Sequence, residues 1–219
     1  MRFDVSSPQQ PRQTKREAIL AAATTRFGRD GYEHTKWADI AADVGVGPTA
    51  LYHYFESKQH CLFVLMDDAI EHFRSRFLTL TAGNPERLAA LAAVLQDCFN
   101  LTEQGVLRNR LLTAEQGRLA RSAGSPREEE ARTAARARIR DLEFEWATFL
   151  GHAMAQGDIP EADPRLLTRS VLGLYNSIWQ WYRPNGIIKL PDVAEFFNGR
   201  ALAMIGVAPE GVIRPRMVA

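Results

Sequence analysis

Apolar residues recur at three- and four-residue intervals along almost the whole chain, and glycine and proline interrupt this pattern repeatedly. This spacing is that of the buried face of an α-helix. No segment shows the alternation of apolar and polar residues that is typical of a half-buried strand. Hydrophobic residues make up 46% of the chain, which is enough to bury a core. The pattern therefore predicts an all-α protein.

Other classes of protein lack their expected signals. No apolar run approaches the ~20 residues of a membrane helix, and the N-terminus has no apolar core of a signal peptide. Cys61 and Cys98 are too few for a disulfide framework and indicate free thiols in a reducing cytoplasm. The histidines are scattered, and there is no glycine-rich phosphate loop or pair of catalytic acids. We expect no metal, no cofactor, no membrane partner and no enzymatic activity.

Capping residues and breakers predict where the helices begin and end. Thr14 and Glu17 have the spacing of a capping box at the start of the first helix, and Gly31 would end it. Thr35 is expected to cap the second helix and Ser57 the fourth. The predicted organisation is a flexible tail (1–13), a helix-turn-helix domain (14–60), a ligand-binding and dimerisation domain (61–207) and a C-terminal tail (208–219).

The segment 31–58 contains the most informative pattern. Two short helices joined by a glycine turn follow a support helix, which is the arrangement of a helix-turn-helix. In that motif the second helix lies in the major groove with its N-terminal residues near the base edges. The small residues from Gly47 to Ala50 would let the backbone approach DNA closely, and Trp37 is expected to brace the helices from the core.

Hydroxyl, imidazole and ammonium groups in this segment are candidate DNA contacts. Thr49 can donate to a base or a phosphate, and Ala50 can touch a thymine methyl group. Lys58 lies in the first turn of a helix, where it can face a phosphate. Solvation alone explains Lys36 equally well, and a structural role explains His53. The predicted DNA-binding residues are Thr35, Lys36, Pro48, Thr49, Ala50, Tyr52, His53 and Lys58.

From about Lys15 to Met66 the chain resembles the DNA-binding domain of TetR-type bacterial repressors. The most specific part is Leu51-Tyr52-His53-Tyr54-Phe55-Glu56-Ser57-Lys58. The resemblance implies an all-helical homodimer that binds operator DNA and is released by a small ligand in its C-terminal domain. Two positions depart from the family pattern: Gly47 replaces the usual serine, and Thr49-Ala50 replaces the usual Gly-Thr or Ser-Thr. Because these positions lie among the base-reading residues, the operator sequence is left open.

The segment Leu172–Gly186, with its Trp-Gln-Trp-Tyr-Arg-Pro-Asn-Gly ending, is similar to the penultimate helix of TetR-type proteins that regulate fatty-acid, steroid or related acyl-chain catabolism. Several of those respond to acyl-CoA thioesters, so the resemblance implies an acyl-CoA or another long apolar ligand. The predicted ligand-binding residues are Phe99, Phe144, Phe149, Tyr175, Trp179 and Arg183. Core packing is the alternative for each aromatic residue, and Arg183 could instead balance a helix C-terminus.

The opposite side of the same helix carries small residues that would let another helix approach closely. Together with the last helix it could form the four-helix dimer interface that the family uses. The predicted interface residues are Ser170, Gly173, Ser177, Trp181, Phe197 and Ala201.

Charge gives the DNA-binding hypothesis no support. The net charge is +1, and residues 1–60 hold eight basic and seven acidic side chains. Backbone amides and neutral donors would therefore carry much of the phosphate binding. The Arg- and Glu-rich stretch around Glu128 and Arg132 is interpreted as a solvated helix face. Two alternatives stay open: a TetR-like drug-sensing efflux regulator, and a helical ligand-binding or enzymatic bundle that does not bind DNA.

Overall fold

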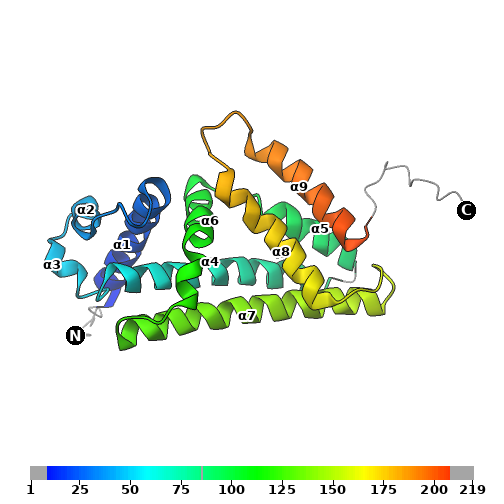
Figure 1. Ribbon diagram of the computed structural model, residues 1–219, viewed down its shortest axis with the longest axis horizontal. Coiled ribbons are helices and arrows are strands. Elements are labelled where there is room, and N and C mark those ends of the chain that lie inside the picture. Colours follow the sequence, from blue (N-terminus) through cyan, green and yellow to red (C-terminus); the bar gives the residue numbers. More distant parts are fainter. Residues whose placement is uncertain (1–8, 85, 208–219) are drawn as a thin grey trace, which may run out of the picture. The chain divides into compact units, whose positions relative to one another are not determined.

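The computed structural model describes residues 9–84 and 86–207, and all regular structure in these ranges is helical (Figure 1). The elements are α1 (Gln9–Asp30), α2 (Trp37–Asp43), α3 (Pro48–Leu51), α4 (Lys58–Thr81), α5 (Arg87–Asp97), α6 (Glu103–Glu115), the short 3₁₀ helix η1 (Gln116–Ala120), α7 (Pro126–Ala155), α8 (Pro164–Trp181) and α9 (Leu190–Ile205). No strand occurs within the described ranges, and the predicted all-α class is confirmed.

Several helix ends lie where the sequence placed them. Gly31 and Gly45 have φ angles of +88° and +64°, a left-handed conformation that glycine adopts without steric cost. Ser57 caps α4, because its Oγ accepts a hydrogen bond of 2.9 Å from the backbone N–H of His60. Asp163 caps α8, where its carboxylate accepts from the backbone N–H of Arg165 at 2.8 Å.

The start of α1 differs from the prediction. This helix begins at Gln9, so Thr14 and Glu17 lie inside it and do not form a capping box at its N-terminus. Pro11 falls in the first turn, where a missing N–H costs no intrahelical hydrogen bond. The expected tail is therefore helical from residue 9 onwards. Residues 1–8 and the expected tail 208–219 lie outside the described residues.

The end of α3 and the start of α2 also differ from the sequence-based expectation. Helix α3 ends at Leu51, although the sequence pattern from Thr49 to Phe55 predicts a longer helix; the N–H groups of His53 and Tyr54 bond carbonyls three residues earlier instead of four. Thr35 does not cap α2, since the N-cap position belongs to Lys36, which makes no side-chain capping bond.

The chain divides into two compact units, Met1–Ile70 with Thr102–Arg138, and Glu71–Leu101 with Ile139–Ala219. Helices α4 and α7 each contribute one part to each unit. The predicted boundary between residues 60 and 61 stays a prediction.

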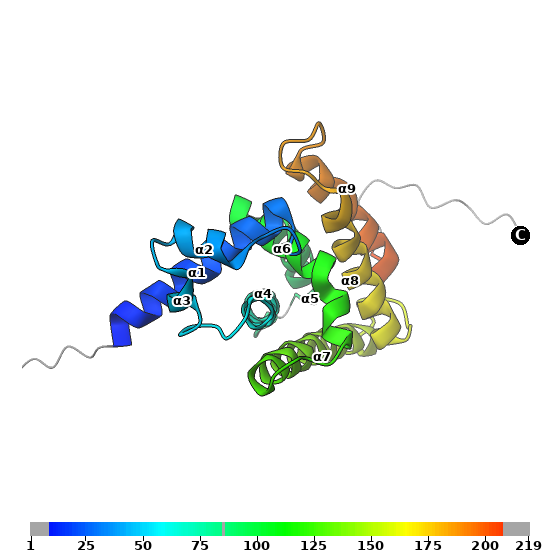
Figure 2. The same cartoon turned by 60° about the vertical axis from the view of Figure 1, so that its left-hand side comes forward.

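In the first unit, α1 packs against α2 and α6 (Figures 1 and 2). A Cβ atom at Gly28 would lie only 2.7 Å from the Cβ of Leu107, so the absence of a side chain permits this approach of α1 to α6. Arg26 Nε donates to the carboxylate of Asp43 at 2.6 Å and ties α1 to the end of α2. This guanidinium also lowers the pKa of Asp43.

In the second unit, α9 packs on both α5 and α8. The largest fully buried side chains of this unit are Trp146, Trp179, Leu91, Leu150 and Ile178. Phe77 of α4 stacks on Trp146 of α7 with a centroid distance of 4.8 Å. The core of this unit therefore combines aromatic and aliphatic side chains, and α8 contributes to it from its inner side.

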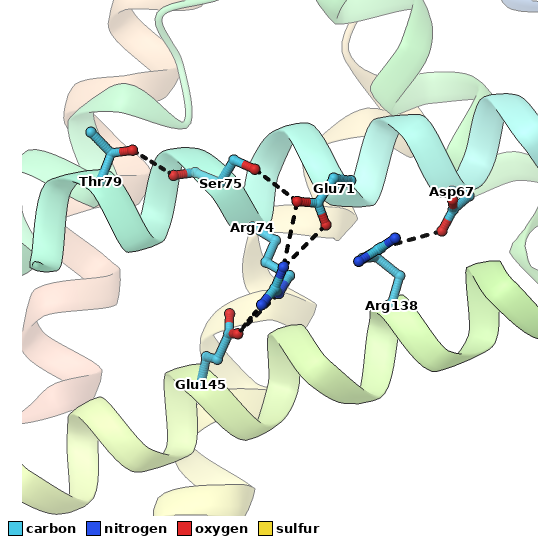
Figure 3. Close-up of polar contacts among 7 residues, drawn as sticks. All are labelled: Asp67, Glu71, Arg74, Ser75, Thr79, Arg138 and Glu145. Carbon is cyan, nitrogen blue, oxygen red and sulfur yellow. Dashed lines mark hydrogen bonds and ion pairs between the residues drawn. The ribbon is translucent and has the colours of Figure 1, made fainter.

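Ion pairs join α4 to α7 within each unit (Figure 3). In the second unit, Arg74 Nη2 donates to Glu145 Oε1 at 2.6 Å, and Glu71 also accepts from Arg74. In the first unit, Arg138 Nε donates to Asp67 at 3.4 Å. The hydrogen bond to Glu145 raises the pKa of Arg74.

Candidate nucleic-acid interface and apolar cavity

Helices α2 and α3 form the helix-turn-helix expected within residues 31–58 (Figure 1). Leu51 is fully buried and Phe55 is 1% exposed, so these two side chains anchor the C-terminal side of α3 to the core. Trp37 meets Phe55 edge-on with ring centroids 6.5 Å apart, which is the bracing contact expected of it. This anchoring leaves the N-terminal residues of α3 at the surface, with Gly47 at the N-cap and Pro48 at the first position.

Six of the eight predicted DNA contacts are accessible in this arrangement. Tyr52 is 55% exposed, Ala50 is half-buried, and the others are exposed. These six residues are Lys36, Pro48, Thr49, Ala50, Tyr52 and His53. The accessible set comes from the start of α2, from α3 and from the turn after it, and its members stay predictions as DNA contacts.

The other two residues, Thr35 and Lys58, make hydrogen bonds inside the protein. Thr35 is 4% exposed, and its Oγ1 donates to the carbonyl of Gly31 at 2.9 Å. Lys58 Nζ donates to the carbonyls of Tyr32 at 2.8 Å and Thr35 at 3.0 Å. Burial lowers the pKa of Lys58. These bonds fix the loop between α1 and α2, which favours a positioning role for both side chains over direct contact with DNA.

The Tyr32 ring lies between two cations. Lys58 Nζ is 4.3 Å from the ring centroid, and Arg118 Cζ of η1 is 4.4 Å from it. Arg118 also bonds Glu33, and burial raises the pKa of Tyr32 to about 12. The loop that leads into α2 is thus held from both α4 and η1. The role of Arg118 was missed because no local motif connects it with a loop so distant in the sequence.

The charged start of α7 is partly buried, and its interpretation as a solvated face was wrong. Glu128 is 8% and Arg132 is 9% exposed. Glu128 accepts hydrogen bonds from Ser57 Oγ and from the N–H of Gly124, the latter at 2.9 Å. Arg132 donates to the carbonyl of Leu119 at 2.7 Å. These bonds connect α7 to the cap of α4, directly after the turn that follows α3.

The second unit contains a small apolar cavity of about 20 Å³. Its wall contains no charged side chain among the described residues. The lining comes from α4, α5, α7, α8 and α9 and consists of Phe73, Leu95, Cys98, Phe99, Trp146, Val171, Leu172, Leu174, Tyr175, Ile178, Phe197, Asn198 and Ala201. A space of this size holds about one water molecule, so the cavity is too small for an organic ligand in this conformation.

Tyr175 is at the centre of the aromatic side chains around this cavity. Its ring stacks on Phe73 at 5.6 Å and meets Phe99 and Trp179 edge-on at 5.7 and 5.4 Å. Its hydroxyl donates to the carbonyl of Cys98 at 2.8 Å, which joins α8 to the C-terminal end of α5. Phe99, Tyr175 and Trp179 were predicted as ligand contacts, and the structure brings them together.

The remaining predicted ligand residues lie elsewhere. Phe149 is half-buried against Phe77, at a centroid distance of 5.8 Å. Phe144 is 71% exposed and does not line the cavity, because its side of α7 faces outwards. Arg183 Nη1 donates to the carbonyls of Gln180 and Tyr182, which is the helix C-terminal role named as the alternative.

The predicted dimer residues fall on two sides of the α8–α9 pair. Ser170 and Gly173 are exposed and Trp181 is 43% exposed, so this side of α8 is accessible, and these residues stay predictions as interface contacts. Ser177 and Phe197 are half-buried. Ala201 is 5% exposed and lines the cavity, so it is poorly placed for a partner. The exposed apolar side chains of α9 are Phe196 and Met204, at 56% and 42%.

Both thiols are buried, and burial raises the pKa of Cys61 and Cys98. Cys98 is therefore a small buried side chain and not a reactive thiolate. Residues 9–84 and 86–207 contain no group of three His, Cys, Asp or Glu side chains that could hold a metal ion. No helix in these ranges is long and apolar enough to span a membrane.

Comparison with known proteins assigns this architecture to a family. Residues 19–65 match the family of bacterial regulatory proteins described as the tetR family, and residues 86–205 match the tetracyclin repressor-like C-terminal domain. The chain belongs to the TetR family. It is therefore a DNA-binding transcription regulator and not an enzyme, and regulators of this class bind operator DNA as dimers and respond to small ligands.

Individual relatives are distant but cover nearly the whole chain. The HTH-type transcriptional repressor KstR2 of Mycolicibacterium smegmatis is 24% identical over 190 residues, covering 86% of this chain and 89% of the relative. AibR in complex with isovaleryl coenzyme A and operator DNA has a TM-score of 0.70 at 23% identity, with 85% and 97% coverage. The ketosteroid regulator KstR2 of Mycobacterium tuberculosis has a TM-score of 0.69 at 22% identity, with 93% and 97% coverage. These structural similarities confirm the fold.

Proposed function

We propose that this regulator is a repressor released from a palindromic operator by a small apolar ligand, and that an acyl-CoA thioester is the best candidate. The observation that carries the proposal is the apolar, aromatic-lined cavity of the second unit. The AibR structure that this chain resembles contains isovaleryl coenzyme A, which supports a thioester of the same class. Because the protein acts on DNA, we place it in the cytoplasm.

The cavity must open before any acyl group enters it. Its volume of about 20 Å³ is far below that of a ligand-filled pocket, which is typically several hundred Å³. The ligand therefore binds a second conformation, in which the rings of Phe73, Phe99 and Tyr175 have separated. A ligand shifts a conformational equilibrium by its differential affinity for the two states, so a ligand that fits only the widened cavity would favour the released state.

On the DNA side, the N-terminal residues of α3 enter the major groove. Thr49 and Ala50 contact base edges, while Lys36 and Tyr52 reach phosphates beside the groove. Thr35 and Lys58 position the loop that leads into α2. In the dimer, the two α3 helices lie about one turn of DNA apart, ~34 Å. The ligand favours a dimer with another spacing, and by linkage DNA weakens ligand binding by the same factor.

The composition of the cavity wall decides between classes of ligand. A pocket for apolar cations, as in a drug-sensing efflux regulator, would be expected to place a carboxylate near the ligand. No Asp or Glu side chain lines the cavity in the described residues. The lining therefore favours an uncharged acyl group over a cationic drug.

A DNA-binding assay with a filled-cavity variant tests the proposal. Fluorescence anisotropy with the protein's own promoter DNA is repeated with a panel of acyl-CoA thioesters and the matching free acids. We expect one class of thioester to weaken binding in the native protein and not in Ala201→Met, whose added atoms occupy the cavity. Ala93→Met, an exposed position on α5, is the matched control and should respond like the native protein.

The outcomes separate the parts of the proposal. Release by a thioester that Ala201→Met abolishes supports both the ligand class and the cavity. Operator binding that no thioester disturbs would overturn the acyl-CoA assignment. Release that persists unchanged in Ala201→Met would overturn the cavity as its site.

A further inference from the structure

Three arginine side chains converge on an open depression between α7 and α8 in the second unit. The depression has a volume of about 260 Å³ and is lined by Arg140, Glu143, Phe144, Ala147, Arg165 and Arg169. Its volume is thus more than ten times that of the apolar cavity. None of its lining residues was predicted to bind an anion.

The positive charge in this depression is only partly neutralised. Arg169 pairs with Glu143 at a distance of 3.5 Å, and the Arg169 side chain is 68% exposed. Arg140 and Arg165 have no ion pair with another described residue. Three arginine residues and one glutamate therefore line the depression, in a chain whose net charge is only +1. Guanidinium groups bind phosphate through paired N–H donors. The depression is therefore suited to a ligand whose phosphate groups present several oxygen atoms as acceptors.

An aromatic ring forms part of the same wall. Phe144 is 71% exposed, the highest value for any aromatic ring among the described residues. A planar base or another flat apolar group that stacks on this ring would remove apolar surface from water. The combination of a free ring face with arginine side chains matches a nucleotide better than it matches an inorganic anion.

The depression and the apolar cavity are both lined by residues of α7 and α8. Leu172, which lines the cavity, follows Arg169 by three residues on α8, ~4–5 Å along the helix axis. On α7, the cavity residue Trp146 directly precedes the depression residue Ala147. A ligand with an apolar end and a nucleotide end joined by a flexible arm can therefore reach both sites in one unit.

We propose that this depression binds the phosphorylated adenosine moiety of the ligand, with phosphates on Arg140, Arg165 and Arg169 and the base on Phe144. The assignment to a coenzyme A thioester rests on the proposed function, whereas binding of the nucleotide itself does not. Glu143 opposes the anion, and its pairing with Arg169 orients that guanidinium.

Isothermal titration calorimetry on the full-length dimer tests the site with a probe that lacks an acyl group. The probe is adenosine 3′,5′-bisphosphate, with adenosine and pyrophosphate as its two halves. We expect one bisphosphate to bind per protomer, with an affinity that falls as the salt concentration rises. Adenosine alone and pyrophosphate alone should each bind more weakly than the bisphosphate. Phe144→Ala should lower the affinity for the bisphosphate and leave the affinity for pyrophosphate unchanged, because only the base contacts the ring.

Charge-removing substitutions locate the binding. Arg165→Gln and Arg140→Gln should each weaken the bisphosphate about tenfold, a typical effect of losing a charge-assisted phosphate contact. Arg136→Gln is the matched control, because Arg136 is an exposed arginine on α7 outside the depression. Equal affinity in Arg165→Gln and Arg136→Gln, or no bisphosphate binding at millimolar concentration, would overturn the proposal. A dimer lost in Arg165→Gln by light scattering would also overturn it, because the arginine would then serve subunit contact.

The test separates this inference from the proposed function. If the bisphosphate binds in an arginine-dependent way while no thioester releases DNA, the nucleotide site is supported and the proposal of an acyl-CoA-responsive repressor is refuted. If thioesters release DNA equally well from the native protein and from Arg165→Gln, the repressor stands and the nucleotide site is refuted.

Discussion

The contact between α1 and α6 leads to the sharpest prediction, which concerns Gly28→Ala. An alanine Cβ would lie 2.7 Å from the Cβ of Leu107 and 3.0 Å from its carbonyl oxygen. Carbon atoms in contact prefer about 3.5–4.0 Å, so one helix must move by roughly 1 Å. Two of the three nearest atoms belong to the backbone of Leu107, and a flexible side chain cannot simply turn away.

The magnitude follows from two opposing effects. Overpacking costs about 1–3 kcal/mol, whereas alanine gains about 0.5–1 kcal/mol over glycine inside a helix. We expect the free energy of unfolding to fall by about 1–2 kcal/mol and Tm by about 2–8 °C for a chain of this size. Gly151→Ala, inside α7, is the control. An alanine Cβ there would contact only Pro164, at 4.0 Å, so this substitution should leave the free energy of unfolding unchanged or raise it.

Urea unfolding followed by circular dichroism at one fixed dimer concentration measures both variants. Helix α1 also supports α2, so Gly28→Ala should weaken operator binding even at temperatures where the protein is fully folded. A Gly28→Ala protein as stable as Gly151→Ala would refute the argument from the close helix approach.

Three further variants test other parts of the molecule. Lys58→Met should weaken operator binding without changing the slope of log affinity against log salt, because Lys58 holds a loop; a slope smaller by about 1 would instead reveal a direct phosphate contact. Glu129, whose pKa is lowered to about 2 by the hydrogen bond from Arg132, should stabilise the fold above pH 4.5 and lose that effect as the pH falls towards 2. Glu129→Gln should therefore flatten acid unfolding in this window, and an unchanged acid limb would contradict the assignment. Tyr175→Phe removes the bond to the Cys98 carbonyl, about 1 kcal/mol, and should lower the releasing ligand concentration about fivefold in an anisotropy titration. An unchanged or higher releasing concentration would show that this hydrogen bond does not hold the cavity closed.

Most helix positions could be predicted from the sequence because their signals are local. Gly31, Gly45 and Ser57 act through their own φ angle or hydroxyl group, and the structure agrees with each. The prediction that Thr14 caps the first helix was wrong, because a capping box is informative only where a helix begins and α1 starts five residues earlier. A polar segment containing proline can still extend a helix whose apolar stripe is already anchored.

The residues of the candidate sites were harder to place, because their roles depend on contacts between distant segments. Lys58 matched a phosphate-binding pattern, yet carbonyls of an earlier loop take its donors. Glu128 and Arg132 lie in a stretch of Ala, Arg and Glu with no apolar stripe, so nothing in the sequence defined which face of α7 is buried. Phe144 matched the aromatic composition of a pocket, but hydrophobicity alone does not determine the rotational position of one ring on a long helix.

Because the empty cavity is too small for its ligand, the sensitivity of the regulator can be set separately from its selectivity. The apparent affinity for the ligand is its affinity for the open form multiplied by the fraction of protein that is open. Substitutions in the ring cluster around Tyr175 can change this fraction without altering an atom that touches DNA or the ligand. The concentration at which a gene responds could thus be retuned in evolution, or by design, while the same operator and the same inducer are kept.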